Sequence, residues 1–325
     1  MTDSHPKKVL VIRFNAIGDL VLTSPTVKAL AKEGYEVHFL VKKAFDSILS
    51  SNPHLTKVWT LSDSLSELIS QLKKESFDYI VDLHNNFRSK KVAAALPAQT
   101  YTLKKDRVGQ WLLTNLGINK IKEQHIVHRF LDVVQPLGIE IAEPQTEYYF
   151  ADDSRTGLVL PAKYLAIAIG AAWKTKEIPV EKLAYIIDTT VWKEIVLLGG
   201  PDDAAKADRL LGLTKKPVTN LVGQLSIASS AQVVQTATVL LTGDTGMMHI
   251  AAALDTAIVA VFGSTHPILG YTPFMKKSSY SIIQNEALGC RPCTKQGKSS
   301  CPKGHFKCML DLDYRTLVHK IDDYI

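Results

Sequence analysis

Short apolar runs that end at a glycine or a polar residue recur along the chain. Residues 239–242 form one such run, which predicts a buried strand that Gly243 ends. An Ala-rich segment of helical length opens at Gly246, and residues 257–262 predict the next strand. The order of strand, tight turn, helix and strand is typical of a βαβ unit with parallel strands.

The same alternation extends over both halves of the chain. Residues 9–14 predict a strand, and residues 20–32 predict a helix whose regular part starts near Pro25. Further strands are predicted at residues 35–41, 78–83, 164–169, 194–198 and 219–222, and further helices at 226–236 and 312–325. Strands that alternate with helices predict an α/β chain with two doubly wound parallel sheets.

The division into domains follows from the polar, proline-containing stretch 143–161. We place the boundary there and predict domains at 1–155 and 156–311. The stretch 312–325 has helical periodicity and predicts a terminal helix. A chain of 325 residues suits two domains. Two sheets of this kind predict a ligand cleft between them.

Composition and charge limit the partners. Hydrophobic residues make up 46% and charged residues 22%, which is ordinary for a globular protein. The net charge of +6 suits an anionic partner such as a phosphorylated lipid or a sugar phosphate, and no arginine-rich arm indicates nucleic acid. The apolar run at 9–12 is too short for a signal peptide, and no run of about 18 apolar residues predicts a membrane span. We therefore expect a cytoplasmic protein that meets a membrane only at its surface.

Polar residues gather where the strand at 239–242 gives way to its helix. Asp244, Thr245, Gly246 and His249 fall within about the first turn and a half. The unpaired N–H groups of a helix N-terminus at the carboxyl edge of a sheet suit an anionic ligand. The same residues also fit a helix cap with a packed histidine.

The first predicted helix lacks a nucleotide fingerprint. Gly18 is the one glycine where G-x-G-x-x-G needs three, so a nicotinamide-dependent dehydrogenase is disfavoured. Asp19 stands at the helix N-terminus, where it would repel a phosphate. An ionised carboxylate at that place suits a general base, and a plain N-cap is the alternative.

Two basic residues follow strand ends. Arg88 lies in the loop after residues 78–83 and suits phosphate or carboxylate groups of an acceptor. Lys176 lies in a loop of small residues after 164–169 and offers a charge for phosphate. A solvated surface position is the alternative for Arg88.

Five segments together resemble glycosyltransferase family nine, the ADP-heptose:lipopolysaccharide heptosyltransferases. They are VLVIRFNAIGDLVLTSPTVKAL, IGAAWKTKEIP, VLLGGPDD, LLTGDTGMMHIAAALDTAIVAVFGSTHP and CRPCTKQGKSSCPKGHFKCM, and they span residues 9–309. The Gly-Asp-Thr-Gly-x-x-His motif together with the N-terminal Ile-Gly-Asp is fairly specific to the family. The resemblance implies a GT-B architecture and an inverting transfer from a nucleotide-activated sugar, with no metal ion required for catalysis. By analogy with GT-B chains, the helix at 312–325 is expected to return to the first domain.

The resemblance also implies roles for single residues. Asp19 corresponds to the general base that deprotonates the acceptor hydroxyl, and Asp244 to the acid that contacts the donor sugar. The implied donor-binding set is Lys176, Thr175, Asp244, Thr245, Gly246 and His249. The implied donor is ADP-heptose, and the implied acceptor is a phosphorylated glycolipid of the lipopolysaccharide core. A GT-B protein that binds a nucleotide sugar but acts on another sugar or acceptor, that isomerises or hydrolyses its ligand, or that transfers nothing, is the alternative.

All four cysteines lie in one short stretch. Cys290, Cys293, Cys301 and Cys308 have the spacing C-x₂-C-x₇-C-x₆-C, and the first pair has zinc-ligand spacing. A structural zinc ion, reduced packing cysteines and redox-labile pairs all fit this pattern. The sequence leaves open which of the three holds, as it leaves open the oligomeric state.

Overall fold

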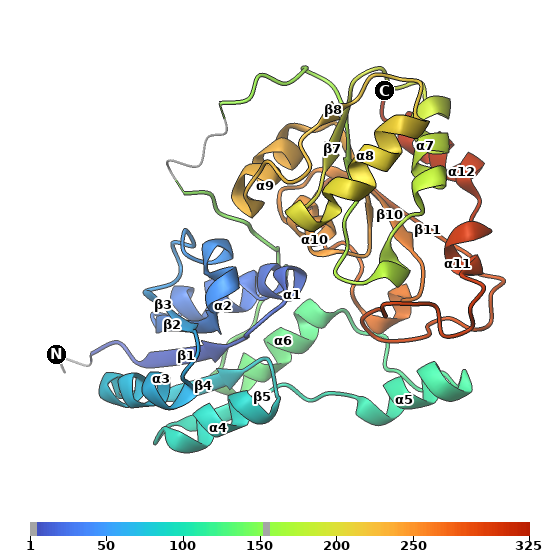
Figure 1. The fold of residues 1–325 in the computed structure, drawn as a ribbon. Coiled ribbons are helices and arrows are strands. Elements are labelled where there is room, and N and C mark those ends of the chain that lie inside the picture. The colour runs from blue at the N-terminus through green and yellow to red at the C-terminus, as the bar shows by residue number, and fades with distance from the viewer. Residues whose placement is uncertain (1–4, 152–156) are drawn as a thin grey trace. The chain divides into compact units, whose positions relative to one another are not determined.

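The structure is a computed structural model that describes residues 5–151 and 157–325, and it divides into two compact units (Figure 1). The first unit comprises residues 5–105 and 124–151, and the second comprises residues 106–123 and 157–325. The predicted boundary at residue 155 lies outside the described residues. Residues 106–123, which the sequence assigns to the first domain, are grouped with the second unit.

The first unit is built on a five-stranded parallel sheet with the order β3-β2-β1-β4-β5. Its strands are β1 (Lys8–Ile12), β2 (Glu36–Lys42), β3 (Lys57–Leu61), β4 (Tyr79–Asp82) and β5 (Gln99–Thr102). Its α-helices are α1 (Ile17–Leu22), α2 (Ser24–Lys32), α3 (Leu65–Leu72), α4 (Phe87–Ala95) and α6 (Ile126–Val134). The chain moves outward from β1 in both directions, so the strand order reverses between β1 and β4.

The helix predicted at 20–32 is divided in two. Pro25 lies in the first turn of α2, where its missing N–H has no helical partner to lose. The break at Thr23 lets the short helix α1 stand separately after β1. Asp19 is consequently placed in the first turn of its own helix.

The second unit contains a six-stranded parallel sheet with the order β11-β10-β9-β6-β7-β8. Its strands are β6 (Leu165–Ala168), β7 (Ile195–Leu198), β8 (Thr219–Asn220), β9 (Val239–Gly243), β10 (Ala257–Phe262) and β11 (Tyr280–Gln284). Its α-helices are α5 (Arg107–Leu116), α7 (Val180–Thr189), α8 (Ala204–Leu213), α9 (Ile227–Thr236), α10 (Gly246–Ala253), α11 (Lys307–Leu310) and α12 (Tyr314–Asp322). Here the strand order reverses between β6 and β9.

Both faces of the second sheet are covered, as a doubly wound sheet requires. Leu165 and Ile167 of β6 point into one apolar cluster, which includes buried residues of α7, α8 and α12. Ala166 and Ala168 point into the other, with residues of α9 and α10. A strand buried on both faces explains why β6 is a continuous apolar run rather than an alternating one.

The C-terminal helix α12 lies in the second unit, not in the first domain, where the sequence analogy places it. Leu317, Val318 and Ile321 are buried in the same cluster as β6. The indole Nε1 of Trp192 donates to the carbonyl of Ile321 at 3.1 Å. The apolar stripe of α12 therefore completes the helical layer beside α7, which explains its place.

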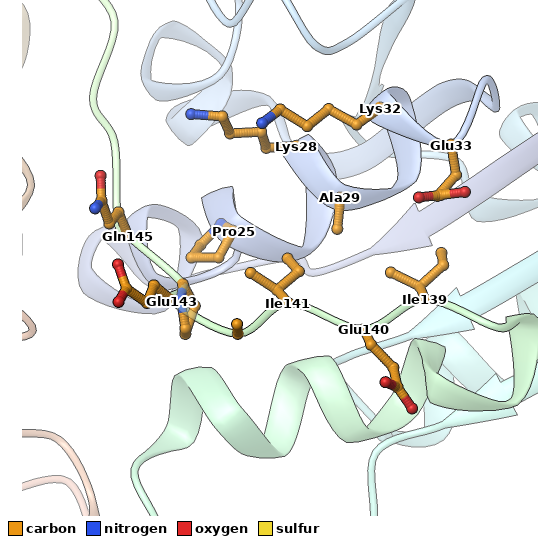
Figure 2. A pocket seen from close by; sticks show the side chains of 12 residues that line it. Pro25, Lys28, Ala29, Lys32, Glu33, Ile139, Glu140, Ile141, Glu143 and Gln145 are labelled. Carbon is orange, nitrogen blue, oxygen red and sulfur yellow. The ribbon is translucent and has the colours of Figure 1, made fainter.

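A cavity of about 410 Å³ lies in the first unit, between α2 and residues 139–145. Figure 2 shows Pro25 and Ala29 on α2 and Ile139 and Ile141 on the facing segment around this space. Its rim carries both signs of charge. Among the described residues that line it, none belongs to the predicted site.

Candidate active site

Asp19 is fixed at the carboxyl edge of the first sheet by a buried arginine. Arg13 directly follows β1, and its guanidinium forms an ion pair with Asp19 Oδ2. Arg13 Nε also donates to the carbonyl of Asn15 at 2.9 Å, and Nη1 to the carbonyl of Leu83 at 2.6 Å. One side chain therefore ties the β1–α1 loop to the end of β4, at the point where the strand order reverses. Open α/β sheets bind ligands at such points.

The second oxygen of this carboxylate is not engaged. Asp19 Oδ1 is buried and has no hydrogen-bond partner within the described part of the chain. A carboxylate with one oxygen held by a cation and the other without a donor can accept a proton at the second oxygen. This is the arrangement that a general base needs.

His84 adds an uncharged ring to this group. Its Nδ1 accepts a hydrogen bond from the backbone N–H of Phe14 at 3.4 Å, so Nε2 carries the ring proton. Burial, reinforced by the positive charges of Arg13 and Lys105 and opposed by Asp19, lowers the pKa of His84 to about 4. At neutral pH His84 is therefore a neutral hydrogen-bond donor in the electrostatic field of Asp19 and Arg13.

The loop that carries His84 is fixed by a buried carboxylate. Asp82 Oδ1 accepts from the backbone N–H groups of His84 at 2.9 Å and Asn85 at 2.7 Å, and Oδ2 accepts from Ser89 Oγ at 2.7 Å. Asn86 and Ser89 form a reciprocal cap at the start of α4. The loop conformation is thus set by side chains within the first unit.

Arg88 lies in the first turn of α4 with an exposed side chain. Within residues 5–151, no hydrogen bond or ion pair joins Arg88 to Asp19. The structure therefore brings Arg13 and His84 to Asp19, but not Arg88. Its role in acceptor binding stays a prediction.

In the second unit, Lys176 and Asp244 meet where the strand order of the second sheet reverses. Lys176 ends the 3₁₀ helix η4 (Lys174–Lys176), which follows β6, and Asp244 follows β9. Lys176 Nζ lies 2.7 Å from Asp244 Oδ2, and both side chains are largely buried. Thr265 Oγ1 donates to the same oxygen at 2.7 Å. Residues predicted from separate segments thus form one ionic group.

Thr175 holds the surrounding loops together. Its buried Oγ1 accepts from Ser264 Oγ and from the backbone N–H of Lys298, both at 2.8 Å. Its own N–H donates to the carbonyl of Lys298 at 3.1 Å. These bonds fix the position of the neighbouring Lys176, so Thr175 acts on that lysine through the backbone.

The N-terminus of α10 opens beside this ion pair. Thr245 is the N-cap residue but its side chain caps no N–H; its Oγ1 pairs with Thr242 Oγ1 at 3.0 Å. The first N–H groups of α10 therefore have no side-chain cap and suit an anion. Gly246 begins the helix, and His249 is buried one turn further along.

Gly243 allows the two loops to approach each other. A Cβ atom at this position would lie 2.6 Å from the carbonyl oxygen of Lys176. Only glycine lets the η4 loop pack this closely on the end of β9. The distance between Lys176 and Asp244 depends on that contact.

The cysteine-rich stretch supports the same edge. The side chain of Arg291 donates to the carbonyls of Phe262 and Thr265, both at 2.8 Å, and the Cys293 N–H donates to the carbonyl of Ser264 at 2.9 Å. These bonds hold the turn that presents Thr265 to Asp244. Arg291 is a positioning residue that the sequence alone does not single out.

The four thiols themselves are free. Burial and the neighbouring thiols raise the pKa values of Cys293 and Cys308 to about 11. Cys290 Sγ lies 3.8 Å from His305 Nε2. Within residues 5–151 and 157–325, no group of three or more His, Cys, Asp or Glu side chains is arranged to hold a metal ion. The structural zinc at these cysteines stays a prediction.

The sequence is similar to those of known proteins. The model of glycosyltransferase family 9 (heptosyltransferase) matches residues 65–303. Lipopolysaccharide heptosyltransferase 3 of Escherichia coli K12 is 27% identical over 297 residues, which are 82% of this chain and 84% of that protein. The lipopolysaccharide core heptosyltransferase OpsX of Haemophilus influenzae is 23% identical over 284 residues, 81% of each chain.

Solved structures agree with the fold. The E. coli ADP-heptose lps heptosyltransferase II superimposes with a TM-score of 0.73 at 16% identity and covers 98% of each chain. The E. coli heptosyltransferase WaaC with ADP superimposes with a TM-score of 0.71 at 18% identity, over 98% of this chain and 100% of that one. The predicted pair of Rossmann-like sheets of the GT-B type is confirmed. Because the family model matches well over half of its residues, the chain belongs to glycosyltransferase family 9, the heptosyltransferases.

Proposed function

We propose that the protein transfers a heptose from ADP-heptose to the core of a lipopolysaccharide precursor, with inversion at the anomeric carbon. The observation that carries the proposal is the Lys176–Asp244 pair beside the uncapped start of α10. It offers a cation and backbone N–H groups to a diphosphate and a carboxylate to sugar hydroxyls. Relatives named as lipopolysaccharide heptosyltransferases support the choice of donor and acceptor.

The chemistry is a single displacement. Oδ1 of Asp19 takes the proton of the acceptor hydroxyl while the hydroxyl oxygen forms its bond to the anomeric carbon. The bond from that carbon to the diphosphate oxygen breaks at the same time, and ADP leaves with the electron pair. Lys176 and the α10 N–H groups stabilise the charge that develops on the diphosphate. Because attack and departure occur on opposite faces of the sugar, the configuration inverts.

The two oxygens of Asp244 have separate roles in this scheme. Oδ2 is engaged by Lys176 and Thr265, which orient the carboxylate. The remaining acceptor capacity of Asp244 is available to the hydroxyl groups of the donor sugar. A sugar with hydroxyls at the same positions would fit equally well, so Asp244 selects a class of sugars rather than heptose alone.

The acceptor places the reaction at a membrane surface. Within the described residues, no helix is long and apolar enough to cross a bilayer. We infer that the protein works as a peripheral enzyme on the inner face of the cytoplasmic membrane. The net charge of +6 supports contact with a phosphorylated glycolipid.

A transfer assay tests the function. Purified protein is incubated with ADP-heptose and a Kdo-lipid acceptor in the presence of EDTA, and ADP release and the anomeric configuration of the product are measured. We expect acceptor-dependent ADP release that falls about 10²- to 10⁴-fold in Asp19→Asn, while ADP binding by calorimetry is retained. Asp63→Asn, at an exposed position of the same unit, is the control. Binding of ADP without turnover would support the donor site but reject heptose as the sugar or the Kdo-lipid as the acceptor.

A further inference from the structure

Helix α5 exposes most of its apolar residues. Val108 is 71%, Trp111 56% and Leu116 57% exposed, whereas Leu113 is the buried leucine of the helix. At 100° per residue the three exposed side chains and the half-buried Leu112 lie on one side of the helix. Amphipathic helices of globular proteins normally turn their apolar side toward the core. Helix α5 instead turns its apolar side toward solvent.

The helix is held by its own ends rather than by burial of this face. Asp106 caps the N-terminus by accepting from the Gly109 N–H at 2.8 Å. At the other end Gly117 has a φ of 69°, and its N–H and that of Ile118 return to the carbonyls of Leu113 and Leu112, both at 3.2 Å. The bond from Gly117 to Leu113 is that of an αL helix cap. The apolar face is therefore preformed.

Basic side chains flank this apolar face in the sequence. Arg107, Lys120 and Lys122 are all exposed. The acidic residues of the same stretch are Asp106, whose carboxylate is used as the helix cap, and Glu123. A short helix with exposed tryptophan and leucine between basic residues matches an anionic lipid surface in both polarity and charge.

We propose that α5 and its flanking lysines form the surface by which the protein docks on an anionic phospholipid membrane. We call residues 106–122, which all belong to the second unit, the docking segment. The inference rests on the proposed function, because a glycolipid acceptor is presented at such a surface. The indole of Trp111 lies at the level of the lipid headgroups, Val108 and Leu116 enter the acyl boundary, and the lysines contact lipid phosphates.

Vesicle sedimentation tests the docking segment. The full-length protein is mixed with vesicles of phosphatidylglycerol and phosphatidylcholine, or of phosphatidylcholine alone. We expect the unchanged protein to bind the anionic vesicles. Binding should fall about tenfold in Trp111→Ser, which loses the indole at the headgroup level, and in Val108→Ser, which loses an apolar contact with the acyl boundary. Val191→Ser is the matched control, because Val191 is 62% exposed elsewhere in the second unit. We expect it to bind like the unchanged protein.

The charges are tested separately. In the double variant Lys120→Gln/Lys122→Gln, binding to anionic vesicles at low salt is expected to be about tenfold weaker. Lys73→Gln/Lys74→Gln, at exposed positions near the end of α3, is the control and should bind like the unchanged protein. Circular dichroism confirms that each variant is folded. The proposal would be overturned if the Trp111 and Val108 variants bound the anionic vesicles as tightly as the unchanged protein, or if the unchanged protein did not bind them. A dimer that exists without lipid and dissociates in Trp111→Ser would also overturn it, since a second copy would then cover the face.

A soluble acceptor separates this inference from the proposed function. With an acceptor freed of its acyl chains, Trp111→Ser is expected to transfer sugar as fast as the unchanged protein. Transfer to that acceptor without vesicle binding would reject the docking segment alone. Vesicle binding that depends on Trp111, without any transfer, would reject the proposed function and leave the docking segment in place.

Discussion

At the scale of single residues, the buried charge of Arg13 explains the geometry around Asp19. Its side chain is only 9% exposed, and a buried guanidinium is tolerated only when its donors are paired. One carboxylate and two backbone carbonyls supply the pairing. Because the carbonyls belong to the loops after β1 and β4, the ion pair cannot rotate without breaking them. Asp19 is thus oriented by the fold rather than by substrate.

Replacement of Arg13 tests this orientation. In Arg13→Met the carboxylate loses its cation, so we expect transfer to slow by about 10- to 100-fold. Arg13→Lys is expected to restore part of the rate, because the positive charge returns. The measurement is kcat/KM at neutral pH, and circular dichroism confirms that each variant is folded. An unchanged kcat/KM in Arg13→Met would show that Arg13 serves stability alone.

His84 makes stability depend on pH. Its pKa is lowered from 6.5 to about 4 in the folded protein, so between these values the unfolded chain binds a proton that the folded protein does not. Stability therefore falls as the pH drops through this window and is fully present above it. We expect the urea midpoint to fall more between pH 7 and pH 5 in the unchanged protein than in His84→Gln. Parallel curves would contradict the assigned burial of His84. The pKa values of His54 and His266 are also lowered, but both residues are present in the unchanged protein and in His84→Gln, so their contributions cancel in the comparison.

Sequence reasoning found some of these residues and missed others for a physical reason. Asp19 and Asp244 stand where a strand gives way to a helix, a place recognisable from local pattern. The roles of Arg13 and His84 depend on partners that lie 70 residues away in the chain. The one available signal was the charge of Arg13 within the apolar run 9–14, since a charge in a buried strand needs a partner.

At the scale of elements, apolar runs predicted most of the strands, but neither helix α5 nor the direction in which it faces was predicted. The strands beside the site are continuous apolar runs, which indicate burial on both faces and hence a parallel sheet. A helix gives the same periodicity whether its apolar side meets a core or remains exposed. Only the structure shows that Trp111 faces outward, and only the structure places α12 on the second sheet.

The contact between β9 and η4 gives a prediction at this scale. In Gly243→Ala the new Cβ would lie 2.6 Å from the carbonyl oxygen of Lys176, so the η4 loop must shift. We expect a loss of about 1–3 kcal/mol in unfolding free energy and weaker ADP binding by calorimetry. Gly212→Ala in α8 is the control, because its Cβ meets no atom within 4 Å. There we expect a gain of about 0.5–1 kcal/mol and unchanged ADP binding.

At the scale of the whole molecule, the two units have separate cores, and α12 belongs to that of the second. Leu317 is fully buried in the cluster that also contains β6 and α7. We expect Leu317→Ala to destabilise the second unit by about 2–5 kcal/mol. Trp192 contacts α12 and reports the second unit by fluorescence, whereas Trp59 reports the first. A shift of both probes by equal amounts would show that the units unfold as one.

Binding of ADP should stabilise the second unit directly and the first unit only indirectly. The groups proposed to hold the diphosphate, Lys176 and the start of α10, lie in the second unit, so ADP stabilises that unit and acts on the first only through it. At an ADP concentration 100 times the dissociation constant of the unchanged protein, ADP is expected to raise the unfolding free energy by about 2.7 kcal/mol. At the same ADP concentration the gain should be smaller in Lys176→Met, because the variant keeps the α10 N–H groups but loses the cation. Lys174→Met, at the exposed start of η4, is the matched control and should retain the gain. Stabilisation by ADP that is equal in both variants would place the diphosphate away from the Lys176–Asp244 pair, and the donor site would then have to be sought elsewhere.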